Sequence, residues 1–162
     1  MPATVGISIA YGAGETVVDD QTEVNFQTSD DVAAHASNPI TIPAGAALAY
    51  SYERYIKAKF AGTFTAITNV KIYKHLGDLP DGVNIKASAV EEAAYVAPVI
   101  TASAIAVNDV PENDTDAIAL TPAAGIAAPG YSKYAVMQMV VSSGASAQTL
   151  AAQTFLIGYD ET

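Results

Sequence analysis

The chain of 162 residues has no cysteine, no tryptophan and only two histidines, His35 and His75. Without cysteine it forms no disulfide framework, no thiolate zinc site and no cysteine nucleophile. The two histidines are far apart in the sequence, and no Gly-x-Ser-x-Gly motif accompanies them. The residues therefore supply no recognisable set of nucleophile, base and oxyanion donor. We expect a protein that is not an enzyme and that has no cofactor.

Positive charge is also scarce, because 7 Lys and Arg stand against 17 Asp and Glu, for a formal net charge of −10. Nucleic-acid binding needs a basic face that releases counterions, and an anionic membrane attracts the same kind of face. The apolar runs are too short to span a bilayer. The first residues carry no Lys or Arg of the kind a secretory signal needs. We expect neither nucleic acid nor membrane as a partner, and synthesis in a cytoplasm.

What the chain does contain is alanine, at 32 positions, together with many β-branched residues. Alanine favours helix, but no helical periodicity lasts beyond about two turns, whereas alternation typical of strands recurs. A bend is expected at Thr68–Asn69, and the uncharged segment 134–142 is expected to be a central strand covered on both faces. The strands expected in this way are 4–11, 23–27, 47–61, 63–73, 83–87, 117–120, 134–142 and 154–159.

Short strands separated by turns are typical of an all-β fold in which two sheets pack together. We therefore predict an antiparallel β-sandwich or jelly roll with about eight to ten short strands. The length suits one domain over residues 1–162. Within it, residues 1–20 are a candidate extended N-terminal segment.

The few cations are not spread evenly, since six of the seven lie between positions 54 and 86, with acidic residues on both sides. One interpretation is a solvated strand face whose charges prevent edge aggregation. The other is a basic patch that meets an acidic partner surface, such as the acidic loops of a neighbouring copy. Tyrosines in the same region suit a wet interface. The candidate partner contacts are Arg54, Lys57, Lys59, Lys71 and Tyr73.

An acidic loop after position 108 is the only candidate metal site that the sequence offers. Asp109, Asp114 and Asp116 are oxygen ligands of the kind Ca²⁺ takes from alternate loop positions. The EF-hand pattern is not met, because the required Gly and Glu are missing. The alternative is a solvated turn in which Asp and Asn side chains bond their own backbone.

The run from Ser51 to Tyr73, SYERYIKAKFAGTFTAITNVKIY, resembles a pattern in virion proteins of tailed bacteriophages. Gly82-Val83, Met137-Gln138 and Tyr159-Asp160-Glu161 fit the same resemblance. The resemblance implies a β-sandwich structural protein of the virus particle, first of all a capsid decoration (cement) protein that self-associates as a homo-oligomer. Its partners would be the major capsid protein or other virion proteins. Its place would be the virion, assembled in the host cytoplasm.

Two alternatives stay open at this point. The same resemblance is compatible with a tail, neck or baseplate component. The acidic loop and the tyrosines are compatible with a carbohydrate- or Ca²⁺-binding β-module used in attachment.

Overall fold

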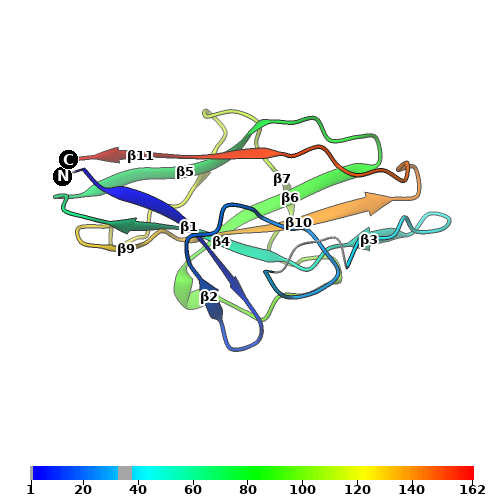
Figure 1. The fold of residues 1–162 in the computed structure, drawn as a ribbon, viewed down its shortest axis with the longest axis horizontal. Helices are drawn as coiled ribbons and strands as arrows, with labels where there is room; N and C mark the ends of the chain where they lie inside the picture. The colour runs from blue at the N-terminus through cyan, green and yellow to red at the C-terminus, as the bar shows by residue number, and fades with distance from the viewer. Residues whose placement is uncertain (1, 33–37) are drawn as a thin grey trace.

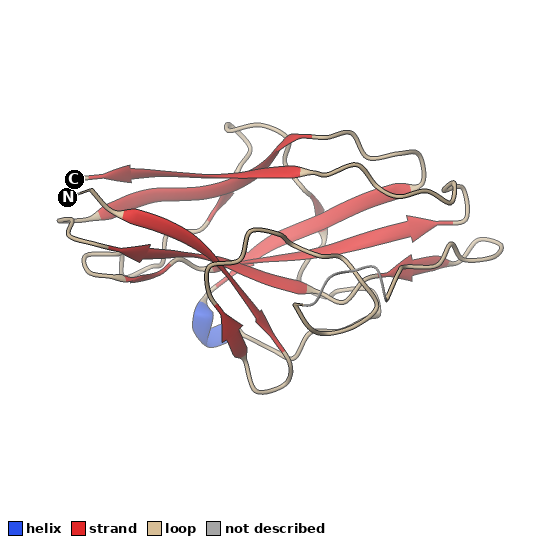
Figure 2. Ribbon diagram, in the orientation of Figure 1, coloured by secondary structure: helices blue, strands red, loops and turns tan. Residues whose placement is uncertain are grey.

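The computed structural model describes residues 2–32 and 38–162. These residues form eleven strands and one short 3-10 turn, Glu92–Ala94, arranged as two packed sheets (Figures 1 and 2). The strands are β1 (Thr4–Tyr11), β2 (Thr16–Val18), β3 (Leu48–Tyr50), β4 (Arg54–Ala61), β5 (Ile67–Leu76), β6 (Val83–Val90), β7 (Asn108–Asp109), β8 (Ile118–Ala119), β9 (Gly130–Tyr131), β10 (Tyr134–Ser142) and β11 (Thr154–Glu161).

The two sheets are unequal in size. The large sheet has the order β2-β1-β4-β10-β6-β7, with β3 also on β10 and β9 also on β4, and the small sheet has the order β11-β5-β8. Every pairing is antiparallel. The predicted all-β antiparallel sandwich is confirmed. The division into eight and three strands does not identify it further as a jelly roll. The strand number exceeds the expectation because five of the strands have only two or three residues.

Strand β10 shows why the sequence folds in this way. It has no charged residue and pairs with β4 on one side and β6 on the other. Its alternate residues Ala135 and Met137 face the small sheet, while Tyr134 and Val136 face the opposite side, and all four are buried. The prediction of a central strand covered on both faces is confirmed.

The main core lies between the two sheets. Ile56 and Phe60 from β4 meet Val70 and Ile72 from β5, and all four are almost completely buried. Burial of each such side chain contributes about 1.5–3 kcal/mol. At the predicted bend, Asn69 has a φ of 51°, and the pairing of β11 with β5 shifts register between Gly158 and Asp160.

The N-terminal region does not extend away from the domain. Residues 4–10 pair with β4 along seven positions, and β1 also forms a hairpin with β2. Residues 23–27 form no strand, but Val24 and Phe26 still pack against the core, as their apolar character predicts. Among the described residues, no helix has the length and apolar character to cross a membrane.

Candidate functional site

The outer face of the large sheet, which is turned away from the small sheet, carries a second core. Residues 91–107 lie across this face. Tyr55 of β4 and Tyr134 of β10 pack beneath this segment, against Tyr95, which belongs to it. The Tyr55 ring centre lies 4.7 Å from that of Tyr95 and 5.4 Å from that of Tyr134. Burial raises the pKa of Tyr55 to about 12, so its hydroxyl is neutral at ordinary pH.

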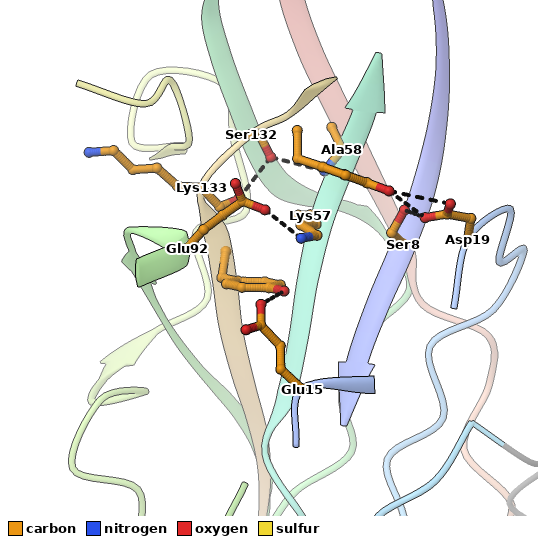
Figure 3. A network of polar contacts seen from close by, with 10 residues as sticks. Ser8, Glu15, Asp19, Lys57, Ala58, Glu92, Ser132 and Lys133 are labelled. Atoms are coloured by element: carbon orange, nitrogen blue, oxygen red, sulfur yellow. Dashed lines mark hydrogen bonds and ion pairs between the residues drawn. The ribbon is translucent and has the colours of Figure 1, made fainter. Parts of the chain in front are cut away.

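Lys57 reaches into this tyrosine cluster. Its ammonium nitrogen lies 4.0 Å from the ring centre of Tyr131 and 4.6 Å from that of Tyr134, and it forms an ion pair with Glu92 (Figure 3). Only 3% of Lys57 is exposed. The expectation that Lys57 contacts a partner is therefore corrected, because the buried ammonium group pairs with Glu92 and holds the turn Glu92–Ala94 against the sheet.

Lys59 is next on the same strand face and stays partly exposed. Its ammonium group lies 2.7 Å from Asp19, which also accepts a hydrogen bond from the Tyr131 hydroxyl at 3.2 Å. Asp19 accepts a further hydrogen bond from Ser8 at 2.6 Å (Figure 3). The hydrogen bond from Lys59 holds the pKa of Asp19 below its usual 3.8. The lysine thus fastens the segment after β2 to the sheet.

Arg54 is buried, with 1% of its surface exposed. Its guanidinium group donates to the backbone carbonyls of Asn25 at 2.7 Å, Ser29 at 2.8 Å and Asp31 at 2.9 Å. Burial lowers the pKa of Arg54, although the nearby Asp30 and Asp31 favour the charged form. The expectation that Arg54 contacts a partner is corrected, because this side chain instead holds the loop 25–31.

Two further buried polar residues hold the segment 95–107, which we call the ribbon. Glu53 accepts hydrogen bonds from the Val99 amide at 3.1 Å and from the Ser103 hydroxyl. Gln138 accepts from the Ser103 amide at 2.9 Å and donates to the Thr101 carbonyl at 2.8 Å. Because these anchors are buried, the ribbon has a defined conformation although it contains little regular secondary structure.

The outward side of the ribbon is apolar. From Tyr95 to Val107 the chain has no charged residue. Among the nine exposed large apolar residues of the described chain, four belong to the ribbon: Val96, Val99, Ile100 and Val107. Grouped apolar exposure of this kind is typical of an interaction site. The sequence analysis missed this surface. The absence of charge from 95 to 107 is no signal by itself, because the longer segments 32–52, 117–132 and 134–159 also lack charged residues.

The acidic loop closes one side of the sandwich through three ion pairs. Asp109 pairs with Lys86 at 2.6 Å and Asp114 with Lys71 at 2.8 Å. Glu112, between them in the sequence, pairs with Lys74 at 2.9 Å. The hydrogen bond from Lys86 lowers the pKa of Asp109.

The three aspartates are therefore not brought together as metal ligands. Asp116, the third candidate, accepts a hydrogen bond from the Asn113 side-chain amide at 3.0 Å instead of facing Asp109 or Asp114. Within residues 2–32 and 38–162, no group of three potential ligands is close enough to hold a metal ion. The turn interpretation, in which Asp and Asn bond neighbouring groups, describes this loop better.

All six lysines pair with carboxylates of the same chain, since Lys133 lies 2.8 Å from Glu91. The charge complementarity that the sequence suggested between neighbouring copies is thus satisfied inside one molecule. Tyr73 is half-buried on the small sheet, where its ring packs edge-on to the His75 ring, with 6.2 Å between the two ring centres. The structure does not gather Arg54, Lys57, Lys59, Lys71 and Tyr73 into one exposed patch.

Comparison of this chain with protein-family models, with curated proteins and with solved structures found no match.

Proposed function

We propose that this chain is a non-enzymatic structural protein of a virus particle, which decorates or cements the capsid through the ribbon 95–107. The observation that carries this proposal is that four of the nine exposed large apolar side chains of the described residues lie in the ribbon, which itself has no charged residue. Apolar contact area on a preformed surface binds without a large cost of ordering. The ribbon is preformed because buried Glu53 and Gln138 hydrogen-bond to its backbone.

The ionisable groups support a structural role. Lys57, Lys59 and Arg54 fasten loops to the large sheet, and the remaining lysines pair with acidic residues of the same chain. The six lysines pair with six of the 17 carboxylates, and the molecule keeps a formal net charge of −10, none of which lies on the ribbon. A capsid surface that offers an apolar patch with a basic rim matches this arrangement.

The resemblance of residues 51–73 to bacteriophage virion proteins supports the choice of a virus particle as the assembly. A tail, neck or baseplate protein would use the same surface chemistry. The place where the protein binds on the particle distinguishes these alternatives from a capsid decoration protein. A major capsid protein is the partner we propose first.

The test is co-sedimentation of the purified protein with capsid shells that lack it, followed by electron microscopy to locate the bound protein. We expect wild-type protein to bind the shell, and Val96→Asp with Val107→Asp to reduce binding at least tenfold. Leu48→Asp is the matched control, because Leu48 is equally exposed on β3, outside the ribbon. Absence of wild-type binding to shells, or unchanged binding of the double variant, would overturn the proposal.

A further inference from the structure

Strand β11 lies at the edge of the small sheet. It pairs with β5 on one side, and among the described residues no strand pairs with its other side. Proteins usually protect such an edge with Lys, Pro, β-bulges or a very short strand. The register shifts of β11 leave Phe155–Gly158 as a regular stretch of edge. From Thr154 to Tyr159 this strand has neither Lys nor Pro, and 37% of Leu156 is exposed.

A groove runs beside this edge. The start of β1 lies next to β11, and the amide of Ala3 donates to the Glu161 carboxylate at 3.0 Å where the two chain ends meet (Figure 1). Between the strands is a groove of about 410 Å³, with an apolar floor formed by Val5, Ile7, Phe155 and Ile157. These apolar side chains are not fully buried in this chain, since 42% of Val5 is exposed and Ile7, Phe155 and Ile157 are half-buried.

The charge around the groove is negative. Asp20 lines it, and Asp160 and Glu161 stand at the end of β11. None of these three carboxylates belongs to a lysine ion pair of the described chain. An occupant that complements this site is therefore an extended segment with alternating apolar residues and at least one Lys or Arg.

We propose that the β11 edge and the adjoining groove accept one additional β-strand, an apolar and basic segment of a partner protein. Backbone hydrogen bonds to the regular part of the edge, Phe155–Gly158, supply the attachment, and the groove takes alternate side chains. This proposal does not depend on the ribbon or on the identity of the assembly. A second copy of this chain fits less well, because it brings ten further negative charges and no lysine without a carboxylate partner.

The probe is a synthetic peptide with the sequence of residues 67–76, ITNVKIYKHL, which has the required alternation and charge. The same residues pair with the opposite side of β11 in this fold, where Lys74–Lys71 of β5 lie across from Phe155–Gly158. We expect the labelled peptide to bind the full chain, measured by fluorescence anisotropy. Amide hydrogen exchange should slow along β11 and at residues 4–6, while exchange along β5 stays unchanged.

Two variants and two controls decide the result. Leu156→Lys or Val5→Lys should weaken peptide binding at least tenfold, because each variant loses an apolar contact and repels the basic peptide, whereas Leu48→Lys, which places the same charge on β3, should not. A peptide with Lys71→Glu and Lys74→Glu should also bind at least tenfold more weakly. No peptide binding, or equal binding to the Leu156→Lys protein, would overturn the proposal. A dimer of the protein that Leu156→Lys dissociates would show that a second copy is the occupant instead.

Discussion

The ammonium group of Lys57 lies 4.0 Å from the centre of the Tyr131 ring, although the two residues are far apart in the sequence. The aromatic faces of Tyr131 and Tyr134 attract the cation, and Glu92 balances its charge. The pair therefore joins β4, β9, β10 and the start of the segment that covers the outer face. This contact makes the covering segment part of the folded core and not a loose loop.

Replacement of Lys57 by Ala should lower the free energy of unfolding by about 2–3 kcal/mol, because cation–π attraction and the packing of the lysine stem are both lost. Lys57→Met should cost less, since Met fills the slot between the rings. Lys133→Ala is the control, because its ion pair with Glu91 is more exposed and should cost about 0.5 kcal/mol. Urea unfolding measures all three, and equal losses at positions 57 and 133 would contradict the assignment.

Arg54→Lys should destabilise the protein by about 2–4 kcal/mol, although the charge is kept. A lysine cannot direct donors to the carbonyls of Asn25, Ser29 and Asp31 at once, so buried acceptors lose their partners. Amide exchange should accelerate at residues 25–32 more than along β10. Unchanged exchange in the loop would show that Arg54 does not hold it.

Gly82→Ala should be far more damaging than Gly12→Ala. Both glycines have a positive φ, 78° and 75°, so each substitution costs about 1–2 kcal/mol of backbone strain. At position 82 a Cβ would also lie 2.5 Å from the backbone nitrogen of Ala145, whereas nothing lies within 4 Å at position 12. Thermal melting of the two variants compares them directly. Similar melting temperatures would contradict the close approach at Gly82.

Stability should fall as the pH drops below about 4, through Asp19 and Asp109. Lysine hydrogen bonds lower the pKa of both carboxyls in the folded state, so their contribution is present above the unfolded pKa and is lost as pH falls through the folded pKa. The Asp19→Asn, Asp109→Asn double variant should melt earlier at pH 6 and lose less stability between pH 6 and pH 3. A double variant with the same pH slope as the wild type would refute this account.

Added Ca²⁺ should leave the melting temperature unchanged within the error of the measurement. A bound cation would stabilise the fold by mass action, but Asp109 and Asp114 already pair with lysines and point to different partners. Differential scanning fluorimetry with Ca²⁺, and with Mg²⁺ as the comparison, tests this. A rise with Ca²⁺ that Asp114→Asn abolishes would restore the metal site as a hypothesis.

Local sequence patterns predicted the position of the long strands. Alternation over 4–11 and the absence of charge over 134–142 gave strands with these bounds, and the structure places strands there. The expected strand 47–61 is divided into β3 and β4, and the expected strand 63–73 is observed at Ile67–Leu76. Residues 23–27 show the limit of this reasoning, since Val24 and Phe26 reach the core from a loop. Burial of an apolar side chain requires an apolar neighbour but no particular backbone conformation.

The sequence by itself determined the fold class, because the period of two residues that sends Ile56 to the core and Lys57 to the other face is a local property of a strand. Only the tertiary structure decided whether that other face meets water. Lys57 looked like a surface residue, yet Glu92 and Tyr131 come from distant segments to cover and neutralise it. The same reason explains the acidic loop, whose partners are lysines of two other strands. Exposure is a property of the assembled fold, since a charge is buried only where distant residues supply its partners.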